Sequence, residues 1–400
     1  MTETYRILMV APTSFFLDYG CHVRILEEVR ALQQLGHQVT IITYYMGRDI
    51  PGLEIVRTRS TPWRADYEVG SSRHKIAFDA LLGWTGLKIV LRRRFDIIHS
   101  HLHDGALIGY FLSQIQRIPL VADFQGSMTA EMVDHHFLNP DGPWYYWVRL
   151  LETRIDHLPN IIVTSTTQAA QMLKEDFDCD PDRVLALPDR VNVDFFHPDV
   201  LSHDQIAAQR TALGVPTGWP VAVYLGLLAD YQGIPHLVQA ARILKERGVE
   251  VCFLIGGFPG VPGYRQMAAD MGVGDRVIFR GKIPREETPV HLALGDIAVA
   301  PKISTTEGCG KILEYMAMRL PTVAFDAPQN REYMENLGTY ANQTGDPVAL
   351  ADAIAGLLND PQGCIELGQK LRERAIRHFS WDRVGRDLVA VYRTVLTSKT

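Results

Sequence analysis

The sequence is poor in cysteine, and the few cysteines that it has form no pattern. Five occur in 400 residues, at Cys21, Cys179, Cys252, Cys309 and Cys364. Their number is odd and no two stand at the spacing of a zinc-ligand pair, so the sequence predicts neither a disulfide framework nor a zinc site. We expect a protein of a reducing, cytoplasmic compartment.

Long apolar runs and a surplus of basic charge are also missing. No stretch approaches the roughly 18 consecutive apolar residues of a membrane-spanning helix. The first residues, MTETYRILMVAP, do not resemble a secretory signal, so we expect a chain that is neither secreted nor membrane-spanning. The net charge of −6 at pH 7 provides no basic field for a nucleic-acid backbone, and we expect no nucleic-acid partner.

What the sequence contains is an alternation of short apolar runs and amphipathic segments. RILMVAP, residues 6–12, is typical of a buried strand, and the helical pattern that follows it ends at Gly36 before another apolar run. Repeated units of this kind predict parallel sheets covered by helices. A turn-rich stretch interrupts the series once, which predicts α/β domains over 1–192 and 193–378, followed by an amphipathic helix within 379–400.

The segment TTEGCGKILEYMA, residues 305–317, leads from an apolar run through a glycine turn into a helical pattern. In open parallel sheets, ligands bind beyond the carboxyl ends of the strands, and the amides of glycines such as Gly308 and Gly310 can approach an anion. Lys311 suits a diphosphate, and Glu314, three residues later on the same helix face, suits a ribose hydroxyl pair. The opposite face would pack through Ile312, Leu313, Met316 and Ala317.

A structural interpretation of the same segment stays open, in which the glycines make an ordinary turn and Lys311 forms a solvated pair with Glu314. The segment is not a Walker phosphate loop. Thr305 stands where that motif has its first glycine, and Ile312 where it has serine or threonine. ATP hydrolysis is therefore disfavoured.

The longer stretch DIAVAPKISTTEGCGKILEYMAMRLPTVAFD resembles the donor-site region of the retaining glycosyltransferases of family 4, which have the GT-B fold. The likeness extends to GCHVRILEEVRALQQLGHQVTIIT, FDIIHSHLHDG, YLGLLADYQGI and FSWDRV. The resemblance implies two Rossmann-like, doubly wound parallel-sheet domains facing across a cleft. The first would bind the acceptor and the second the nucleotide sugar, and the C-terminal helix would return to the first domain.

We expect donor contacts that need no metal ion, because no Asp-x-Asp motif follows a strand at a plausible donor site and the helix N-terminus with Lys311 can hold the diphosphate. They are Gly20, Gly226, Gln232, Gly308, Cys309, Gly310, Lys311, Ile312 and Glu314. A simple helix start is the competing explanation for Gly20.

The sequence departs from the family pattern at two places in this site. Most members carry two glutamates with seven residues between them, but here Thr306 stands eight residues before Glu314 and Glu307 one step later. Either Glu307 takes the usual place against the donor sugar, which we favour, or Thr306 and the backbone replace it. The family's arginine and lysine after the first strand of the second domain are replaced by Leu227 and Gln232.

With those cations gone, the diphosphate would rely on Lys311, the glycine amides and the helix N-terminus, or on a basic residue elsewhere. Loss of activity is the alternative.

The stretch HSHLHD places His99, His101 and His103 two residues apart, so that on a strand all three would share a face. Metal binding is one interpretation of this pattern. The family resemblance instead puts His101 at the sugar-transfer centre and treats His99 as a packed structural residue. His103 and Asp104, just past the expected strand end, could contact the acceptor.

The next polar stretch, DFQGSMTAEM, offers Gln125 and Glu131 for hydrogen bonds to acceptor hydroxyls, although a polar loop with a helix cap explains it nearly as well. Two further stretches, WTGLKIVLRRRF and GPWYYWVRL, join aromatic and apolar residues to arginines. They fit either core packing or peripheral contact with an anionic membrane surface.

These patterns together predict a metal-independent hexosyltransferase without a cofactor. It would move a sugar from a UDP- or GDP-sugar to a hydroxyl acceptor, which could be a sugar, a lipid-linked molecule or a small molecule, with retained configuration. Such chemistry needs stabilisation of a departing diphosphate more than a strong base, and the resemblance assigns catalytic roles to His101, Glu307 and Lys311. The alternatives are a GT-B epimerase or hydrolase of sugar nucleotides, or an inactive nucleotide-sugar-binding regulator.

Overall fold

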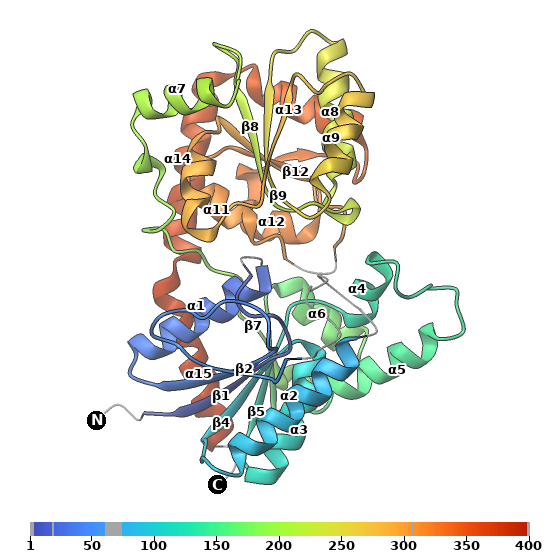
Figure 1. Cartoon of the computed structure of the whole chain (residues 1–400), viewed down its shortest axis with the longest axis vertical. Helices are drawn as coiled ribbons and strands as arrows, with labels where there is room; N and C mark the ends of the chain where they lie inside the picture. The colour runs from blue at the N-terminus through green and yellow to red at the C-terminus, as the bar shows by residue number, and fades with distance from the viewer. Residues whose placement is uncertain (1–3, 18–19, 61–73, 306–307, 398–400) are drawn as a thin grey trace. The chain divides into compact units, whose positions relative to one another are not determined.

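The computed structural model describes residues 4–17, 20–60, 74–305 and 308–397. It contains two compact units (Figure 1). The first comprises the described residues up to Pro188, with Gly308 and the chain from Trp381 onward. The second comprises Asp189–Thr305 and Cys309–Ser380.

The first unit is built on a parallel sheet of seven strands in the order β3-β2-β1-β4-β5-β6-β7. The strands are β1 Arg6–Ala11, β2 Gln38–Thr43, β3 Glu54–Arg57, β4 Ile97–His101, β5 Leu120–Phe124, β6 Ile161–Thr164 and β7 Val184–Ala186. The helices are α1 Gly20–Gln34, α2 Lys75–Val90, α3 Leu102–Gln116, α4 Met128–Asp134, α5 Tyr145–Asp156, α6 Thr167–Glu175 and α15 Val384–Thr397, with 3₁₀ turns η1 Pro181–Arg183 and η6 Trp381–Arg383.

Alternate residues of each strand pack against different helices, as the pleat requires. Met9 of β1 packs in a core with α1 and α15, whereas its neighbour Val10 packs with α2 and α3. Both faces of the sheet are therefore covered, which explains why β1 is apolar from Ile7 to Ala11.

The last helix belongs to the first unit. Leu388 and Tyr392 of α15 are buried in the core that also contains residues of α1. The approach is close, because a Cβ atom added at Gly385 would lie 2.9 Å from the backbone oxygen of Ala31. Before the helix, the indole nitrogen of Trp381 donates to Glu27. These contacts confirm that the C-terminal helix returns to the first domain.

The second unit is built on a parallel sheet of six strands in the order β10-β9-β8-β11-β12-β13. The strands are β8 Val221–Leu227, β9 Cys252–Phe258, β10 Val277–Gly281, β11 Ile297–Ala300, β12 Thr322–Phe325 and β13 Thr339–Ala341. The helices are α7 His203–Ala212, α8 Ile234–Glu246, α9 Val261–Asp270, α10 Thr288–Ala293, α11 Lys311–Ala317, α12 Pro328–Met334, α13 Pro347–Leu358 and α14 Pro361–Phe379, with 3₁₀ turns η2 Pro198–Val200, η3 Asp230–Gln232, η4 Arg285–Glu287 and η5 Glu335–Leu337.

Both units are doubly wound, as the sequence predicted. The strand order changes direction between β1 and β4 in the first unit and between β8 and β11 in the second. Beyond the carboxyl ends of such strands lies the usual ligand site of an open α/β sheet.

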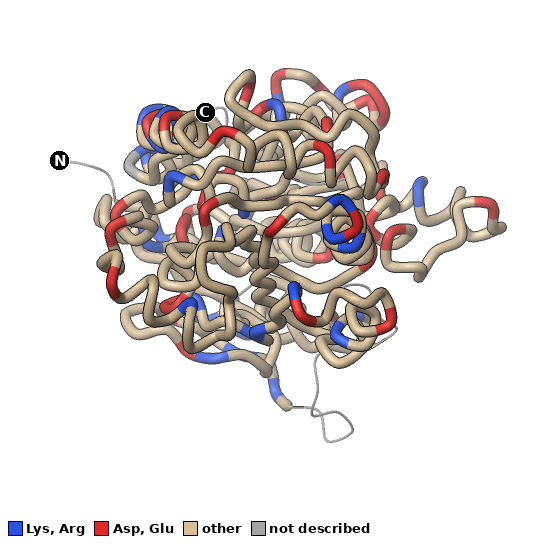
Figure 2. The backbone as a smooth tube through the Cα atoms, turned by 90° about the horizontal axis from the view of Figure 1, so that it is seen from above, with Lys and Arg blue, Asp and Glu red and all other residues tan. Residues whose placement is uncertain are grey.

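Charged residues of both signs are interspersed along the backbone (Figure 2). Among the described residues, no helix is both long and apolar enough to cross a membrane.

Candidate active site

The predicted donor segment lies where the second sheet changes direction. The chain leaves β11 at Ala300 and enters α11 at Lys311. As expected from the helical pattern, one face of α11 is buried, through Ile312, Leu313, Met316 and Ala317 together with Tyr315. The helix has only 7 residues, so its dipole is weak and the side-chain charge of Lys311 becomes the larger source of positive potential.

The structure brings Lys311 together with Gln232, the residue that replaces the family lysine. The Lys311 Nζ atom donates to Gln232 Oε1 at 2.8 Å and to the Tyr224 hydroxyl at 3.0 Å. It also lies 4.4 Å from the centroid of the Tyr224 ring, within the range of a cation–π contact. Burial raises the pKa of Tyr224 well above its ordinary value, so its hydroxyl stays neutral beside the ammonium group.

Gly226 makes room for this arrangement at the end of β8. Its φ angle is +150°, and an added Cβ atom would lie 2.7 Å from Lys311 Nζ. Both the backbone conformation and the space therefore favour glycine at this position. Three of the predicted donor residues, Gly226, Gln232 and Lys311, are thus in contact or nearly so.

Glu314 has a partner that sequence reasoning missed. It forms an ion pair with Arg285 of η4, and the two side chains are only 15% and 14% exposed. The Arg285 guanidinium lies 4.7 Å from the ring centroid of Phe196. Because Arg285 stands 29 positions before Glu314 in an ordinary loop sequence, no local pattern pointed to it. The sequence left open a basic residue elsewhere in the chain that could replace the missing family arginine and lysine, and Arg285 is a candidate for it.

The other residues of the donor segment are less informative. Cys309 is buried, and an added Cβ atom at Gly310 would lie 3.4 Å from Asp189 Oδ2. Gly308 is described, but Thr306 and Glu307 lie outside the described residues, so the choice between them stays a prediction.

In the first unit, His99 and His101 lie on strand β4 and His103 lies past its end, as expected. Strand β4 ends at His101, and Leu102, with a φ angle of +60°, turns the chain directly into α3. His99 and His101 therefore lie on one face, whereas His103 lies in the first turn of the helix.

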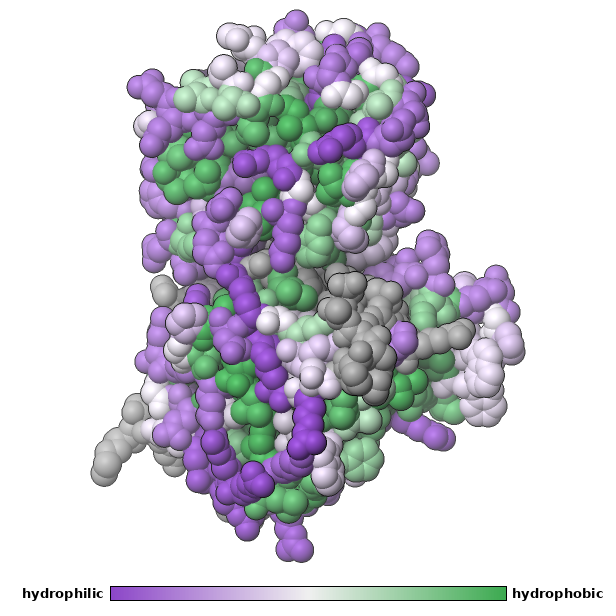
Figure 3. Space-filling view, viewed as in Figure 1, coloured by the Kyte–Doolittle hydropathy of each residue, from purple (hydrophilic) through white to green (hydrophobic). Residues whose placement is uncertain are grey.

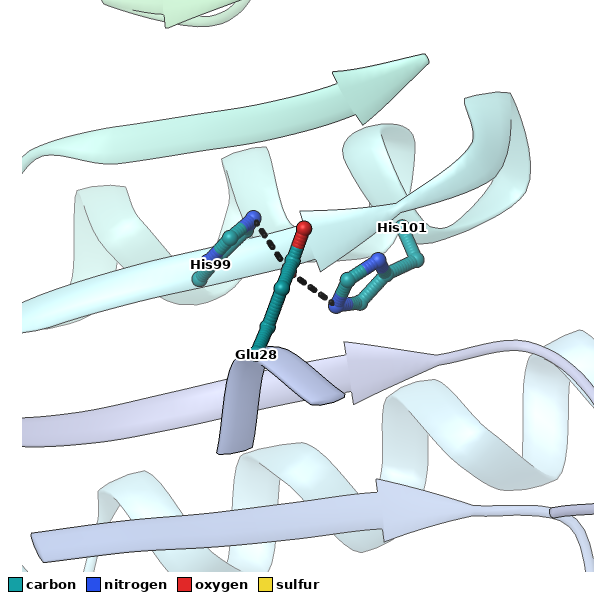
Figure 4. A group of neighbouring side chains, drawn as sticks. All are labelled: Glu28, His99 and His101. Atoms are coloured by element: carbon teal, nitrogen blue, oxygen red, sulfur yellow. Dashed lines mark ion pairs between the residues drawn. The ribbon is translucent and has the colours of Figure 1, made fainter. Parts of the chain in front are cut away.

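His99 and His101 point toward Glu28 of α1 (Figure 4). The Nε2 atom of each ring lies 3.8 Å from Glu28 Oε2, and the two rings stack with centroids 4.8 Å apart. All three side chains are buried. Burial lowers the pKa of His99 well below its ordinary value, so this imidazole is neutral at physiological pH.

The outer nitrogens of the two rings are held by hydrogen bonds. Nδ1 of His99 pairs with the Tyr392 hydroxyl at 2.7 Å, and Nδ1 of His101 with Asp123 Oδ2 at 3.1 Å. Arg24 donates to both oxygens of Asp123, at 2.8 and 3.0 Å. Burial alone would raise the pKa of Asp123, but the Arg24 charge and the His101 hydrogen bond hold it well below its usual range.

The predicted acceptor residues His103 and Asp104 are paired within the first unit. The His103 ring stacks on Phe124 at 4.3 Å, and its Nε2 atom lies 3.2 Å from Asp156 Oδ1. Burial disfavours the charged ring, but Asp156 raises the pKa of His103 overall. Asp104 forms an ion pair with Lys75 of α2. An acceptor would have to compete with these partners.

The remaining predicted residues lie around the N-termini of α1 and α4. Gly20 begins α1, and an added Cβ atom there would meet nothing within 4 Å. The Gln125 Nε2 atom lies 3.5 Å from Asp123 Oδ2. Ser127 caps α4 by accepting from Ala130 N at 3.2 Å, whereas the Glu131 side chain is 39% exposed. The capping explanation holds for Ser127, while Glu131 is accessible to a ligand.

Two family models match the chain and cover most of it. The model described as "Glycosyltransferase Family 4" matches residues 20–195, and the model described as "Glycosyl transferases group 1" matches residues 219–360. The chain belongs to glycosyltransferase family 4. It is 25% identical to the D-inositol 3-phosphate glycosyltransferase of Corynebacterium glutamicum over 405 residues, covering 95% of this chain and 93% of that protein.

Solved structures agree on the fold of this glycosyltransferase. The sucrose-phosphate synthase of Thermosynechococcus elongatus superposes with a TM-score of 0.83 at 18% identity, covering 98% of this chain and 100% of that chain. Anabaena Alr3699/HepE in complex with UDP-glucose superposes with a TM-score of 0.77 at 15% identity, covering 98% and 100%. The predicted GT-B fold is confirmed.

Proposed function

We propose that this glycosyltransferase moves a sugar from a nucleoside-diphosphate sugar to a hydroxyl acceptor with retained anomeric configuration. The diphosphate would be bound by side-chain and backbone donors, without a bridging metal ion and without a cofactor. The observation that carries the proposal is the Lys311 ammonium group, which is oriented by Gln232 and Tyr224 beyond the carboxyl end of β8.

A departing diphosphate gains negative charge as the glycosidic bond breaks. A cation that is already fixed in place stabilises that charge without reorganisation, and such preorganised contacts are usually the largest single contribution to catalysis. Gln232 can accept from Lys311 without competing for the phosphate charge, since its amide is neutral. Arg285, 14% exposed, is ion-paired with Glu314 in the same unit, so its charge is largely offset by that carboxylate.

We assign no strong base to the described residues of the first unit, and retention of configuration does not need one. Both ring nitrogens of His101 face residues of its own unit, namely Asp123 and Glu28. We therefore assign to His101 a positioning role at the end of β4. Gln125 and Glu131 remain the candidates for contact with the acceptor.

The comparisons suggest where to begin the search for substrates. Anabaena Alr3699/HepE was solved with UDP-glucose, so UDP-sugars come first among the donors, ahead of GDP-sugars. The Corynebacterium glutamicum relative is named for D-inositol 3-phosphate, which makes phosphorylated polyols the first acceptors to try.

A donor and acceptor panel tests this function. The protein is incubated with UDP-, GDP- and ADP-sugars, each with and without D-inositol 3-phosphate and a set of simple sugars, and free nucleotide is measured. Release that requires an acceptor, with a product of retained configuration by NMR, supports the proposal. Release without an acceptor would indicate a hydrolase or an epimerase, and an inverted product would contradict the proposed stereochemistry.

We also propose that the first unit contacts an anionic membrane surface. Trp144, Tyr146 and Trp147 at the start of α5 are 71%, 64% and 60% exposed, so core packing does not account for GPWYYWVRL. Exposed Arg154 follows on the same helix, and aromatic side chains beside arginines are typical of interfacial helices. In Figure 3, apolar side chains also reach the surface on the side of this unit that carries α2 and α3.

Flotation with vesicles tests this contact. We expect binding to phosphatidylglycerol vesicles and loss of binding on the double substitution Trp144→Ser and Trp147→Ser. Equal binding of this variant and the wild type would exclude these residues, as would a lack of any preference over neutral vesicles.

A further inference from the structure

The cluster of Glu28, His99 and His101 has the composition of a transition-metal site. Two imidazole nitrogens and one carboxylate oxygen form the protein ligand set of several zinc enzymes and of many iron(II) enzymes. His99 and His101 are 0% exposed, and neither Nε2 atom has a hydrogen-bond partner among the described residues. Buried ring nitrogens without a partner are uncommon and call for an explanation.

We propose that Glu28, His99 and His101 bind a divalent transition-metal ion of the zinc type within the first unit. The Nε2 atoms and Glu28 Oε2 converge on one region, each nitrogen lying 3.8 Å from the oxygen. Ligand atoms of a tetrahedral zinc ion lie about 3.3 Å apart, as bond lengths of about 2.0–2.1 Å require. The three candidate ligand atoms lie within 4.8 Å of one another, so an inward adjustment of the two rings and of the Glu28 side chain, drawn in Figure 4, would bring them to this spacing.

The surroundings match those of known histidine ligands. A metal-bound histidine normally uses its other ring nitrogen to hydrogen-bond a carboxylate or similar group, which fixes the ring orientation. Here Asp123 fulfils that role for His101, and the Tyr392 hydroxyl pairs with the corresponding nitrogen of His99. In both rings Nδ1 is engaged outward, and Nε2 is left directed at the carboxylate.

Charge and ligand type select the class of ion. Two buried carboxylates, on Glu28 and Asp123, offset most of the positive charge of a divalent cation and of Arg24, which contacts both, and leave one net positive charge. Imidazole nitrogen suits zinc, iron, nickel and copper, whereas magnesium and calcium prefer oxygen ligands. The sequence left open a metal site made of the three histidines of HSHLHD. The structure instead groups two of them, His99 and His101, with Glu28 of α1.

The ion would connect α1 to the end of β4, while Tyr392 adds a contact from α15. This role goes beyond sugar transfer and involves no residue of the donor segment. It is distinct from a metal ion that bridges the substrate diphosphate, because the proposed ion is bound by protein groups alone.

Metal analysis of the full chain, without donor or acceptor, tests the proposal. After expression in zinc-supplemented medium and gel filtration in EDTA-treated buffer, we expect one equivalent of metal by inductively coupled plasma mass spectrometry. Dialysis of the metal-stripped protein against Co²⁺ should produce the visible absorption bands of a low-coordinate cobalt site. A clearly substoichiometric metal content together with no cobalt bands would overturn the proposal, with an ordered water then the remaining occupant.

Variants locate the ion. Glu28→Gln and His99→Gln should lose the metal and the cobalt bands, with the fold checked by circular dichroism. His291→Gln, at another buried histidine, is the matched control and should retain one equivalent. Retention of the metal by the first two variants would overturn the proposal. Loss of the metal in His103→Gln alone would also overturn it, because the ion would then lie at His103, whose Nε2 atom is 3.7 Å from Glu152 Oε1 and 3.2 Å from Asp156 Oδ1. Because the wild-type measurement stands by itself, a variant that fails to fold leaves the test decisive.

Discussion

The Nζ atom of Lys311 lies 2.8 Å from Oε1 of Gln232, the residue that occupies the place of a family lysine. The neutral amide of Gln232 still has a role at this position. Its oxygen accepts a hydrogen bond from Lys311 and so orients the remaining cation. The positive potential at this point of the site therefore depends on Lys311 more than it would in a relative that keeps both cations.

Replacement of Lys311 by alanine should reduce turnover more than donor binding. The charge on the diphosphate grows in the transition state, and loss of one preorganised contact to a developing anion typically costs about 3–4 kcal/mol, or roughly a hundred- to a thousand-fold in rate. The measurement is kcat at saturating donor and acceptor, with circular dichroism to check the fold. Lys370→Ala, at an exposed lysine of the same unit, is the control. A Lys311→Ala variant within a few-fold of wild type would remove Lys311 from this role.

Gly226→Ala should reduce kcat because it displaces the Lys311 side chain. The new methyl group would lie 2.7 Å from the ammonium nitrogen and displace it from Gln232. Part of any effect would come from backbone strain, so the control is Gly281→Ala, at a φ angle of +77° with nothing within 4 Å of the added atom. We expect both variants to lose stability in thermal unfolding but only Gly226→Ala to lose most of its turnover. Similar kcat losses in both would point to strain alone.

Glu314→Ala should mainly raise the donor KM. A ribose contact exists in the ground state and the transition state alike, so its loss weakens binding without slowing the bound substrate. A hydrogen bond to a charged group is worth about 1.5–3 kcal/mol, which corresponds to roughly ten- to a hundred-fold in KM. Since Arg285 loses its partner at the same time, Glu314→Gln serves as the comparison that keeps an acceptor for both. A large fall in kcat at unchanged donor KM would contradict the ribose assignment.

Activity should not depend on added divalent ions. In the proposed function, Lys311 and backbone donors take the place of the bridging Mg²⁺ ion of other transferases. Initial rates are compared after brief treatment with EDTA, with and without excess Mg²⁺ or Mn²⁺. We expect equal rates, since the buried cluster at Glu28 would not exchange its ion on this timescale. Full dependence of the rate on the added ion would refute the proposal that the diphosphate is bound without a metal ion.

The stability of the second unit should fall in acid because of His291. Burial lowers the pKa of this residue to about 4, below the value of about 6.5 in an unfolded chain. The unfolded state therefore binds the proton first, so the stabilisation is complete above about pH 6.5 and is lost as the pH falls toward 4. The neutral ring pairs with the Tyr224 backbone oxygen at 3.1 Å.

His291→Gln removes this titration while retaining a hydrogen-bond donor. We expect the urea midpoints of wild type and variant to converge, or to cross, as the pH is lowered from about 7.5 to about 4.5. The difference between their free energies of unfolding should change by at most about 1.4 kcal/mol per pH unit. His203→Gln, at an exposed histidine, should parallel the wild type. A constant difference between wild type and His291→Gln would contradict the assignment.

Periodic patterns in the sequence predicted the architecture because each depends on neighbouring residues. The buried face of α11, with Ile312 and Met316, follows from the 3.6-residue repeat alone. The site depends on contacts between distant segments, which no local pattern encodes. Arg285 reaches Glu314 from another loop, and Glu28 lies near His99 and His101 only because α1 packs on β4. The strand ends before His103 for a local reason, because Leu102, at a φ angle of +60°, turns the chain directly from β4 into α3.

The return of α15 to the first unit has a consequence for the order of biosynthesis. Tyr392 and Leu388 complete a core whose other residues, such as Met9 and Ile25, are made at the very start of translation. The ribosome therefore synthesises the whole of Asp189–Ser380 before it supplies the last piece of that core. The second unit is nearly continuous in sequence and can fold first. The first unit keeps an apolar surface exposed until α15 has been synthesised. Nascent chains halted just before Val384 should accordingly bind chaperones through their oldest segment.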